Sequence, residues 1–130
     1  MDQGRSVVRS FEDLEVWRLG MEVAEAVYAV SSGFPGSERF GLAAQIRRAA
    51  VSIPSNIAEG HARTSTRDFL RFLSIAAGSL AEVRTQLLLA RRLGFIPQDT
   101  STSLLARLDE TGRTLRGLTR SLNAKLPPNP

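Results

Sequence analysis

Residues 65–93 read STRDFLRFLSIAAGSLAEVRTQLLLARRL, and this stretch decides the fold class. Its apolar side chains return every three or four positions, which is the period of one face of an α-helix. They are Phe69, Leu73, Ala76, Leu80, Val83, Leu87 and Ala90. Ser65, with Asp68 three residues later, resembles a capping box at the start of this helix, and Gly94 and Pro97 mark its end. At ~1.5 Å per residue, residues 66–93 predict a helix roughly 40 Å long.

Three other stretches of the chain show the same helical period. The first follows Ser10 and Asp13, which also resemble a capping box, the second extends from Ser37 to Gly60, and the last begins after Asp99. Their apolar stripes are, in order, Leu14, Trp17, Met21, Ala24 and Tyr28, then Leu42, Ile46, Ala49, Ile53 and Ile57, and finally Leu104, Leu108, Thr111, Leu115, Leu118 and Leu122. No stretch alternates apolar and polar residues for long enough to predict a strand. Because short connections join long helices, the sequence predicts an all-α, antiparallel up-down-up-down four-helix bundle.

The 130 residues fit one domain, with the bundle over residues 11–123. Residues 1–10 are expected to form a flexible N-terminal arm, and residues 124–130 a flexible proline-rich tail. The chain has no cysteine, which excludes disulfides and suits a reducing compartment. Residues 1–10 lack the apolar core of a signal peptide, and no apolar run approaches the ~20 residues of a membrane helix. We therefore expect a soluble, cytoplasmic protein without a membrane partner.

A second set of apolar residues lies off the predicted core stripes. It consists of Val16, Val23, Val27 and Val30 in the first helix and Phe72, Leu88 and Leu93 in the third. Some of these side chains widen the buried face of their helix, and the others would form an exposed patch of the kind that marks protein interfaces. We therefore expect the chain to associate with copies of itself.

Pro54 interrupts the second predicted helix. It has no backbone N–H and crowds the carbonyl of Ala50, which costs ~3 kcal/mol unless the helix kinks there. Ser52, Ser55 and Asn56 surround Pro54 and can satisfy the freed backbone groups. The kink is interpreted as structural, with a ligand site built around it as the alternative.

Arginine dominates the basic residues of the chain, whose formal net charge is +4. Between residues 39 and 92 there are nine arginines and three acids, a net charge of +6 (9 − 3). Arg47 and Arg48 have no acid three or four positions away, and Arg63, Arg67 and Arg71 recur every four residues on one face. These five arginines are predicted to contact the phosphates of RNA or DNA.

Two other interpretations of the arginines stay open. Arg47 and Arg48 could pair with the acidic first helix, or the arginines could form an ordinary solvated face. A GC-rich genome also favours arginine over lysine without any functional cause. The tyrosine, the tryptophan and most phenylalanines fall on predicted core positions, so stacking on single-stranded bases is not expected. Binding would instead depend on charge and shape.

Several sequence motifs follow one another from about Phe11 to Leu122. They are FEDLEVW at 11–17, FP at 34–35, ERFGL at 38–42, QIRRAAVSIPSNIAEG at 45–60, and Phe69 followed by AAGSLAE at 76–82. With these motifs the chain resembles the bacterial four-helix-bundle family associated with intervening sequences in 23S rRNA genes, also called the S23 ribosomal protein family. The resemblance implies a four-helix protomer that assembles into a ring-like homopentamer. The family is similar to the accessory protein of diversity-generating retroelements, a basic pentamer that contacts nucleic acid and a reverse transcriptase.

The residue patterns of enzymes and metal sites are missing from the sequence. His61 is the only histidine, no Glu-x-x-His pair exists, and no glycine-rich phosphate loop follows a predicted strand. Without cysteine, thiolate zinc sites and thiol nucleophiles are excluded. The sequence therefore predicts a non-enzymatic homo-oligomer, with no cofactor or metal, that binds nucleic acid, RNA above DNA, through its arginines. The alternative is an oligomeric adaptor that binds an acidic protein partner and has no nucleic-acid role.

Overall fold

The computed structural model describes residue 8 and residues 10–128. It contains four α-helices, α1 (Glu15–Ser31), α2 (Leu42–His61), α3 (Thr66–Arg92) and α4 (Gln98–Asn123). Two short 3-10 turns precede α1 and α2, η1 (Phe11–Asp13) and η2 (Gly36–Glu38). No strand occurs among the described residues, so the predicted all-α class with four helices is confirmed. Most of the predicted N-terminal arm (residues 1–7 and 9) and the last two residues of the predicted tail lie outside the described residues.

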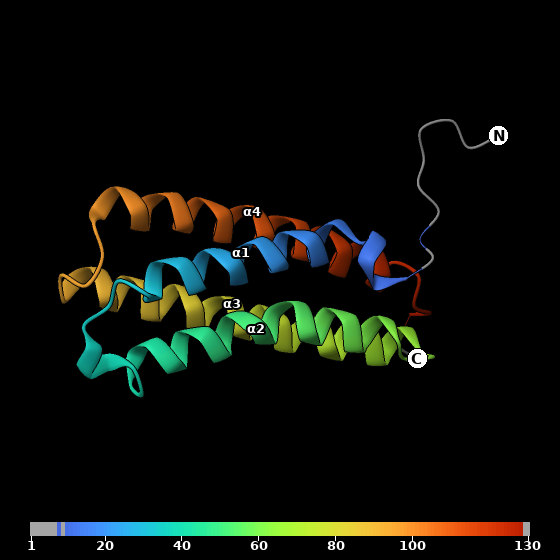
Figure 1. The fold of residues 1–130 in the computed structure, drawn as a ribbon. Coiled ribbons are helices and arrows are strands. Elements are labelled where there is room, and N and C mark those ends of the chain that lie inside the picture. The colour runs from blue at the N-terminus through green and yellow to red at the C-terminus, as the bar shows by residue number, and fades with distance from the viewer. Residues whose placement is uncertain (1–7, 9, 129–130) are drawn as a thin grey trace.

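The helices lie side by side in one elongated bundle (Figure 1). α2 packs against α1 and α3, and α4 packs against the same two helices. α1 begins and α4 ends at the same end of the bundle in Figure 1. Only residues 62–65 connect α2 to α3, and residues 93–97 connect α3 to α4. This arrangement is consistent with the predicted four-helix bundle.

The core consists mainly of the stripes expected for α2, α3 and α4. Ile46, Ile53 and Ile57 of α2 and Val83 and Leu87 of α3 have no exposed surface. In α4 the predicted stripe is buried except for Leu118, which is half-buried. The helical period of these stripes identifies the face that must leave water. α3 also carries apolar residues off its stripe, of which Phe72 is buried and Ile75 and Leu89 are exposed.

α1 buries mainly a different face from the one predicted, although Ala24 of the predicted stripe is buried and Leu14 and Trp17 are half-buried. Its buried residues include Val16, Val23 and Val27, whereas Met21 and Tyr28 are 39% and 48% exposed. α1 carries two apolar stripes, and the period does not distinguish the one that faces the core. Packing selects the stripe with Gly20, since a Cβ there would lie only 3.2 Å from Cγ2 of Ile53 in α2. The small residue lets α1 and α2 approach closely.

The start of α2 also differs from the prediction. Residues 36–38 form the separate turn η2, and α2 begins at Leu42 rather than near Ser37. The carboxylate Oε1 of Glu38 accepts a hydrogen bond from the backbone N–H of Leu42 at 3.0 Å, and so satisfies a free donor at the helix start. The predicted cap of α3 is confirmed, because Ser65 Oγ accepts from the N–H of Asp68 at 3.1 Å.

α2 continues without interruption through the buried Pro54. The side-chain amide of Asn56 donates to the carbonyl and to the hydroxyl of Ser52, both at 2.8 Å. The Ser52 hydroxyl in turn lies 2.7 Å from that of Ser79 in α3. Two of the three polar residues expected near Pro54 therefore bond to the backbone or to α3.

α3 is the one helix among the described residues that is long and apolar enough to cross a membrane by length and composition, with a mean hydropathy of 1.2 in its most apolar window. Its residues Leu73, Ala76, Val83, Leu87 and Ala90 are buried against the neighbouring helices. Only 39% of that window is buried, so the place of α3 in the core accounts for part of its apolar content.

Candidate nucleic-acid interface

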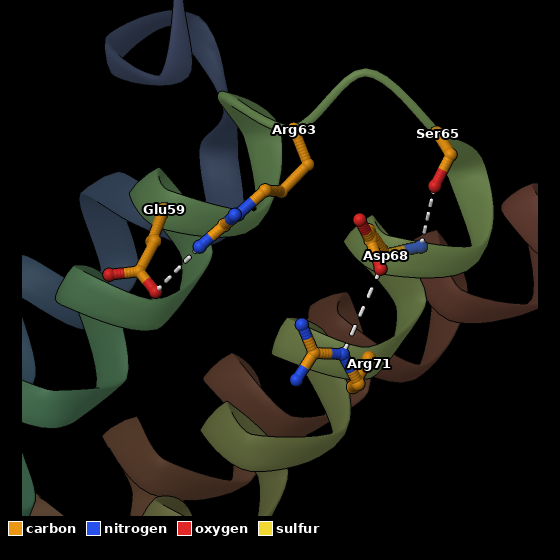
Figure 2. A network of polar contacts seen from close by, with 5 residues as sticks. All are labelled: Glu59, Arg63, Ser65, Asp68 and Arg71. Carbon is orange, nitrogen blue, oxygen red and sulfur yellow. Dashed lines mark hydrogen bonds and ion pairs between the residues drawn. The ribbon is translucent and has the colours of Figure 1, made fainter.

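Two of the predicted arginines lie together where α2 meets α3 (Figure 2). Arg63 follows the end of α2 and forms an ion pair with Glu59 at 3.5 Å, and Arg71 of α3 forms one with Asp68 at 3.8 Å. The four side chains are between 45% and 61% exposed. Exposed pairs of this kind contribute only ~0–1 kcal/mol, so both guanidinium groups can exchange their carboxylate for another anion at little cost.

The same two arginines enclose the ring of Phe72. The Cζ atoms of Arg63 and Arg71 each lie 4.8 Å from the ring centroid, within range of a cation–π interaction. Phe72 is only 6% exposed. The ring therefore holds the arginines in place and offers no surface on which a nucleic-acid base could stack.

Arg67 lies in the first turn of α3, between the two paired arginines in sequence. It is exposed and makes no hydrogen bond or ion pair with any residue that the structure describes. Its guanidinium group carries an unneutralised charge at the surface. Arg67 is the arginine of this cluster that is most accessible to a phosphate.

Arg47 is held against the C-terminal end of α1. Its Nε donates to the Ser31 hydroxyl at 2.7 Å, and its Nη2 donates to the Ser32 hydroxyl at 3.3 Å and the Tyr28 carbonyl at 3.4 Å. Its Cζ lies 4.7 Å from the centroid of the Tyr28 ring. A cation at the negative end of a helix dipole is stabilising. α1 thus provides the partners of Arg47, but they are hydroxyl and carbonyl oxygens and an aromatic ring rather than the carboxylates considered from sequence.

Arg48 lies on the other side of α2, toward α3. It is exposed and makes no hydrogen bond or ion pair within the described part of the chain. With Gln45, Ser52 and Glu82 it lines a polar pocket of about 360 Å³ between α2 and α3. The two adjacent arginines of the sequence motif therefore have different environments, and only Arg48 is free to bind a ligand.

The five predicted arginines do not form one cluster. Arg63, Arg67 and Arg71 lie at one end of α2 and α3, and Arg47 and Arg48 lie in the first turns of α2. α2 has 20 residues, which at ~1.5 Å per residue makes it roughly 30 Å long. A single ligand that contacts both groups must extend along much of the α2–α3 face.

Arg113 of α4 departs from the pairing suggested by its sequence neighbours. Asp109, four residues earlier, instead binds Arg84 of α3 at 2.7 Å. Arg113 is exposed and has no ion pair among the described residues. The sequence contains no acid after Glu110, and this pattern indicates that the arginines of the second half of α4 lack local partners.

The exposed apolar surface also differs from the predicted patch. Of the residues named for it, Val16, Val23, Val27 and Phe72 are buried, Val30 and Leu88 are half-buried, and only Leu93 is exposed. An apolar groove of about 590 Å³ instead lies between α1 and α2. Met21 and Tyr28 of α1 and Val51 and Pro54 of α2 are among its lining residues. Ile75 and Leu89 of α3, and Leu93 directly after its end, expose further apolar surface.

The described residues contain no group of three or more His, Asp or Glu side chains that could hold a metal ion. His61, the only histidine, is half-buried, and its ring packs edge-on against Phe69 with centroids 5.7 Å apart. It contacts no carboxylate among these residues and so lacks the partner that would orient it as a general base.

The sequence model of the 23S rRNA-intervening sequence proteins matches residues 12–117. This chain belongs to that family. A solved structure of a protein of unknown function from the S23 ribosomal protein family of Bacteroides thetaiotaomicron has the same fold, with 24% sequence identity and a TM-score of 0.75. The match covers 81% of this chain and 95% of that one. Comparison with curated proteins gave no significant match.

Membership of the 23S rRNA-intervening sequence protein family confirms the resemblance seen in the motifs. The QIRRAAVSIPSNIAEG motif forms most of α2, including the residues that contact α1 and α3. The family match ends at residue 117, so it includes Arg113 but not the last turns of α4.

Proposed function

We propose that this member of the 23S rRNA-intervening sequence protein family is a non-enzymatic homo-oligomer that binds RNA through the arginines of its α2–α3 face. The observation that carries the proposal is that Arg48 and Arg67 are exposed on this face without a partner among the described residues. Arginine without a structural partner is the residue type best suited to phosphate. The association of the family with 23S rRNA intervening sequences supports RNA as the ligand.

Four of the five predicted arginines have the freedom that phosphate binding needs. Arg48 and Arg67 are unpaired, and the exposed ion pairs of Arg63 and Arg71 are weak enough to open. Arg47 contributes differently, because its guanidinium group is occupied by the end of α1. In this proposal Arg47 holds α2 in position, and its neighbour Arg48 contacts the RNA.

Recognition would depend on charge and shape. Phe72, the aromatic residue nearest the arginine cluster, is buried beneath Arg63 and Arg71. Without a base-stacking surface at this site, the phosphate backbone is the main target, and sequence preference should be weak. A structured RNA presents closely spaced phosphates and is therefore the expected ligand.

Self-association is the second part of the proposal. The protomer is proposed to be an antiparallel up-down-up-down bundle. An apolar groove lies between α1 and α2, and a second apolar area lies on α3. Two different apolar surfaces on one chain favour a head-to-tail contact between copies, which closes into a ring when the rotation allows. A ring would repeat the arginine face around its circumference and raise the local positive potential.

The test is the affinity of purified, nuclease-treated protein for a structured RNA over a series of salt concentrations. For duplex contacts, log affinity should fall with log salt with a slope of about −0.9 per neutralised phosphate. The double variant Arg48→Glu and Arg67→Glu should bind at least ~10-fold more weakly at 0.15 M salt, and its salt slope should be shallower by about 2.

The matched control is the double variant Arg18→Glu and Arg107→Glu. It changes the net charge by the same amount, but its residues lie on α1 and α4. It also breaks the exposed ion pair of Arg107 with Glu22 at 3.1 Å, which contributes only ~0–1 kcal/mol. This control should retain RNA affinity within about threefold if the contact is local. Equal loss in both variants would show that only net charge matters, and no binding by the wild type at low salt would overturn RNA binding in favour of a protein partner.

A further inference from the structure

The C-terminal half of α4 has a strong local excess of positive charge. Residues 111–130 contain Arg113, Arg116, Arg120 and Lys125 and no acid. The three arginines are separated by three and four positions, which places them on one face of the helix. They are exposed, whereas Leu108, Leu115 and Leu122 on the opposite side are buried in the core.

The acids closest to these arginines in sequence are directed elsewhere. Asp109 forms the ion pair with Arg84 at 2.7 Å. Glu110 lines a small pocket with Glu22 and Arg107 on the α1 side of α4. Arg113, Arg116 and Arg120 make no hydrogen bond or ion pair within residues 10–128.

Interactions within α4 do not explain why Arg113, Arg116 and Arg120 share one face of the helix. A cation in the last turn offsets the negative end of the helix dipole, which explains Arg120 at the end of α4. Arg113 and Arg116 lie outside that turn, and the dipole effect does not extend to them. Like charges three or four positions apart repel one another and destabilise a helix. The spacing of these arginines therefore does not stabilise α4.

A shallow pocket of about 320 Å³ adjoins the middle arginine. Arg116 and Arg84 border it from α4 and α3, and Gly112, Ala77 and Ala81 are among its other lining residues. A Cβ at Gly112 would lie 3.2 Å from Nη1 of Arg116, so the glycine leaves room for the guanidinium group. Asp109 also lines this pocket and pairs with Arg84 at 2.7 Å, so Arg116 is the unpaired cation there. The small residues beside Arg116 allow an anionic ligand to approach the backbone closely.

We propose that Arg113, Arg116 and Arg120 form a second RNA-binding face, which contacts the phosphodiester backbone. The arginines extend over roughly 10 Å at ~1.5 Å per residue, a length that matches a short run of phosphates rather than one ion. α4 packs against α1 and α3, so this face is separate from Arg48 and Arg67 on the α2–α3 side. The proposal rests on the proposed function in taking RNA as the ligand.

A phosphate backbone fits this face better than an acidic protein. Protein interfaces are centred on buried aromatic or large apolar anchors, beside which arginine is also enriched. The described residues of α4 include no aromatic side chain and no exposed large apolar one. The surface offers charge and small residues only, which suits a regularly charged polymer without base readout.

The test compares two neutralised variants in the same RNA-binding assay over a salt series. Arg113→Gln, Arg116→Gln and Arg120→Gln are combined in one protein, and Arg48→Gln and Arg67→Gln in another. Glutamine keeps the helix propensity close to that of arginine. The α4 variant should bind at least ~10-fold more weakly at 0.15 M salt, with a salt slope shallower by about 3, and its circular dichroism should be unchanged.

A triple lysine variant tests whether any loss of affinity comes from the lost positive charge or from a disturbed fold. Arg113→Lys, Arg116→Lys and Arg120→Lys keeps the positive charge and should retain affinity within about fivefold. Wild-type affinity in the glutamine α4 variant, together with weaker binding by the Arg48 and Arg67 variant, would overturn the α4 face and leave the proposed function standing. Absence of RNA binding by the wild type would overturn both. Displacement of the RNA by poly-L-glutamate at equal charge concentration would refute phosphate as the preferred ligand of this face.

Discussion

At the scale of single residues, Arg47 and Arg48 show that adjacent arginines can have unrelated roles. A helix turns by about 100° per residue, so neighbours face different elements. Arg47 reaches the last turn of α1 and bonds to Ser31 and Ser32, whereas Arg48 points toward the α3 side and has no partner among the described residues. The sequence suggests equal roles because neither residue has a local acid, but contacts between helices separate them.

Substitution of the two arginines by alanine should affect stability unequally. Arg47→Ala removes the contacts to Ser31 and Tyr28 and should lower the free energy of unfolding by about 1–2 kcal/mol. Arg48→Ala removes no intramolecular hydrogen bond and should change it by less than about 0.5 kcal/mol. Urea unfolding at one protein concentration measures both values. Equal values for the two variants would contradict the assigned role of Arg47.

At the scale of helices, glycines show where the elements approach most closely. A Cβ at Gly60, at the end of α2, would lie 2.7 Å from Cβ of Phe72 and 3.0 Å from Cδ1 of Phe69 in α3. A Cβ at Gly78, within α3, would have no heavy atom within 4 Å outside its own helix backbone. Gly60 is required by the packing of α2 on α3, whereas Gly78 makes no such close contact and only lowers the helix propensity of α3.

Alanine at these two glycines should therefore have opposite effects. Gly60→Ala should destabilise the protein by about 1–3 kcal/mol, because α2 and α3 must move apart at Phe72. Gly78→Ala should stabilise it by up to about 1 kcal/mol, since alanine is the better helix former. Thermal unfolding followed by circular dichroism gives the sign of each effect. A stabilised Gly60→Ala variant would show that α2 and α3 do not approach as described.

The helices also show how far a periodic pattern can be interpreted. In α2, α3 and α4 the predicted apolar stripe is buried, apart from the half-buried Phe69 and Leu118. α1 carries two apolar stripes, and the period does not distinguish them; of the predicted stripe only Ala24 is buried. The true choice depends on Gly20, whose close approach to Ile53 is a property of two helices together.

At the scale of the whole molecule, the stripe of α1 predicted to be buried contributes to an apolar surface groove. Trp17, Met21 and Tyr28, expected in the core, line the groove of about 590 Å³ with residues of α2. Large exposed apolar surfaces are uncommon on monomers and mark interfaces. Within the proposed function, a second copy of the chain covers this groove.

A charge in the groove should disrupt self-association. Met21→Glu places a carboxylate among apolar side chains and should shift the protein to a smaller assembly, since burying an unpaired charge costs several kcal/mol. Ala29→Glu introduces the same charge on an exposed position of α1 outside the groove and should leave the mass unchanged. Size exclusion with light scattering measures both masses. A monomeric wild type at every concentration would refute the assembly.

The amino-acid sequence by itself determined the fold class and the extent of three of the four helices to within a few residues. These depend on neighbours within one or two helical turns. The tertiary structure alone decided which stripe of α1 is buried, that Arg47 holds α1, and that Arg84 withdraws Asp109 from Arg113. Each of these outcomes joins residues from different helices. A periodic pattern describes one helix at a time, so it cannot specify which partner another helix will present.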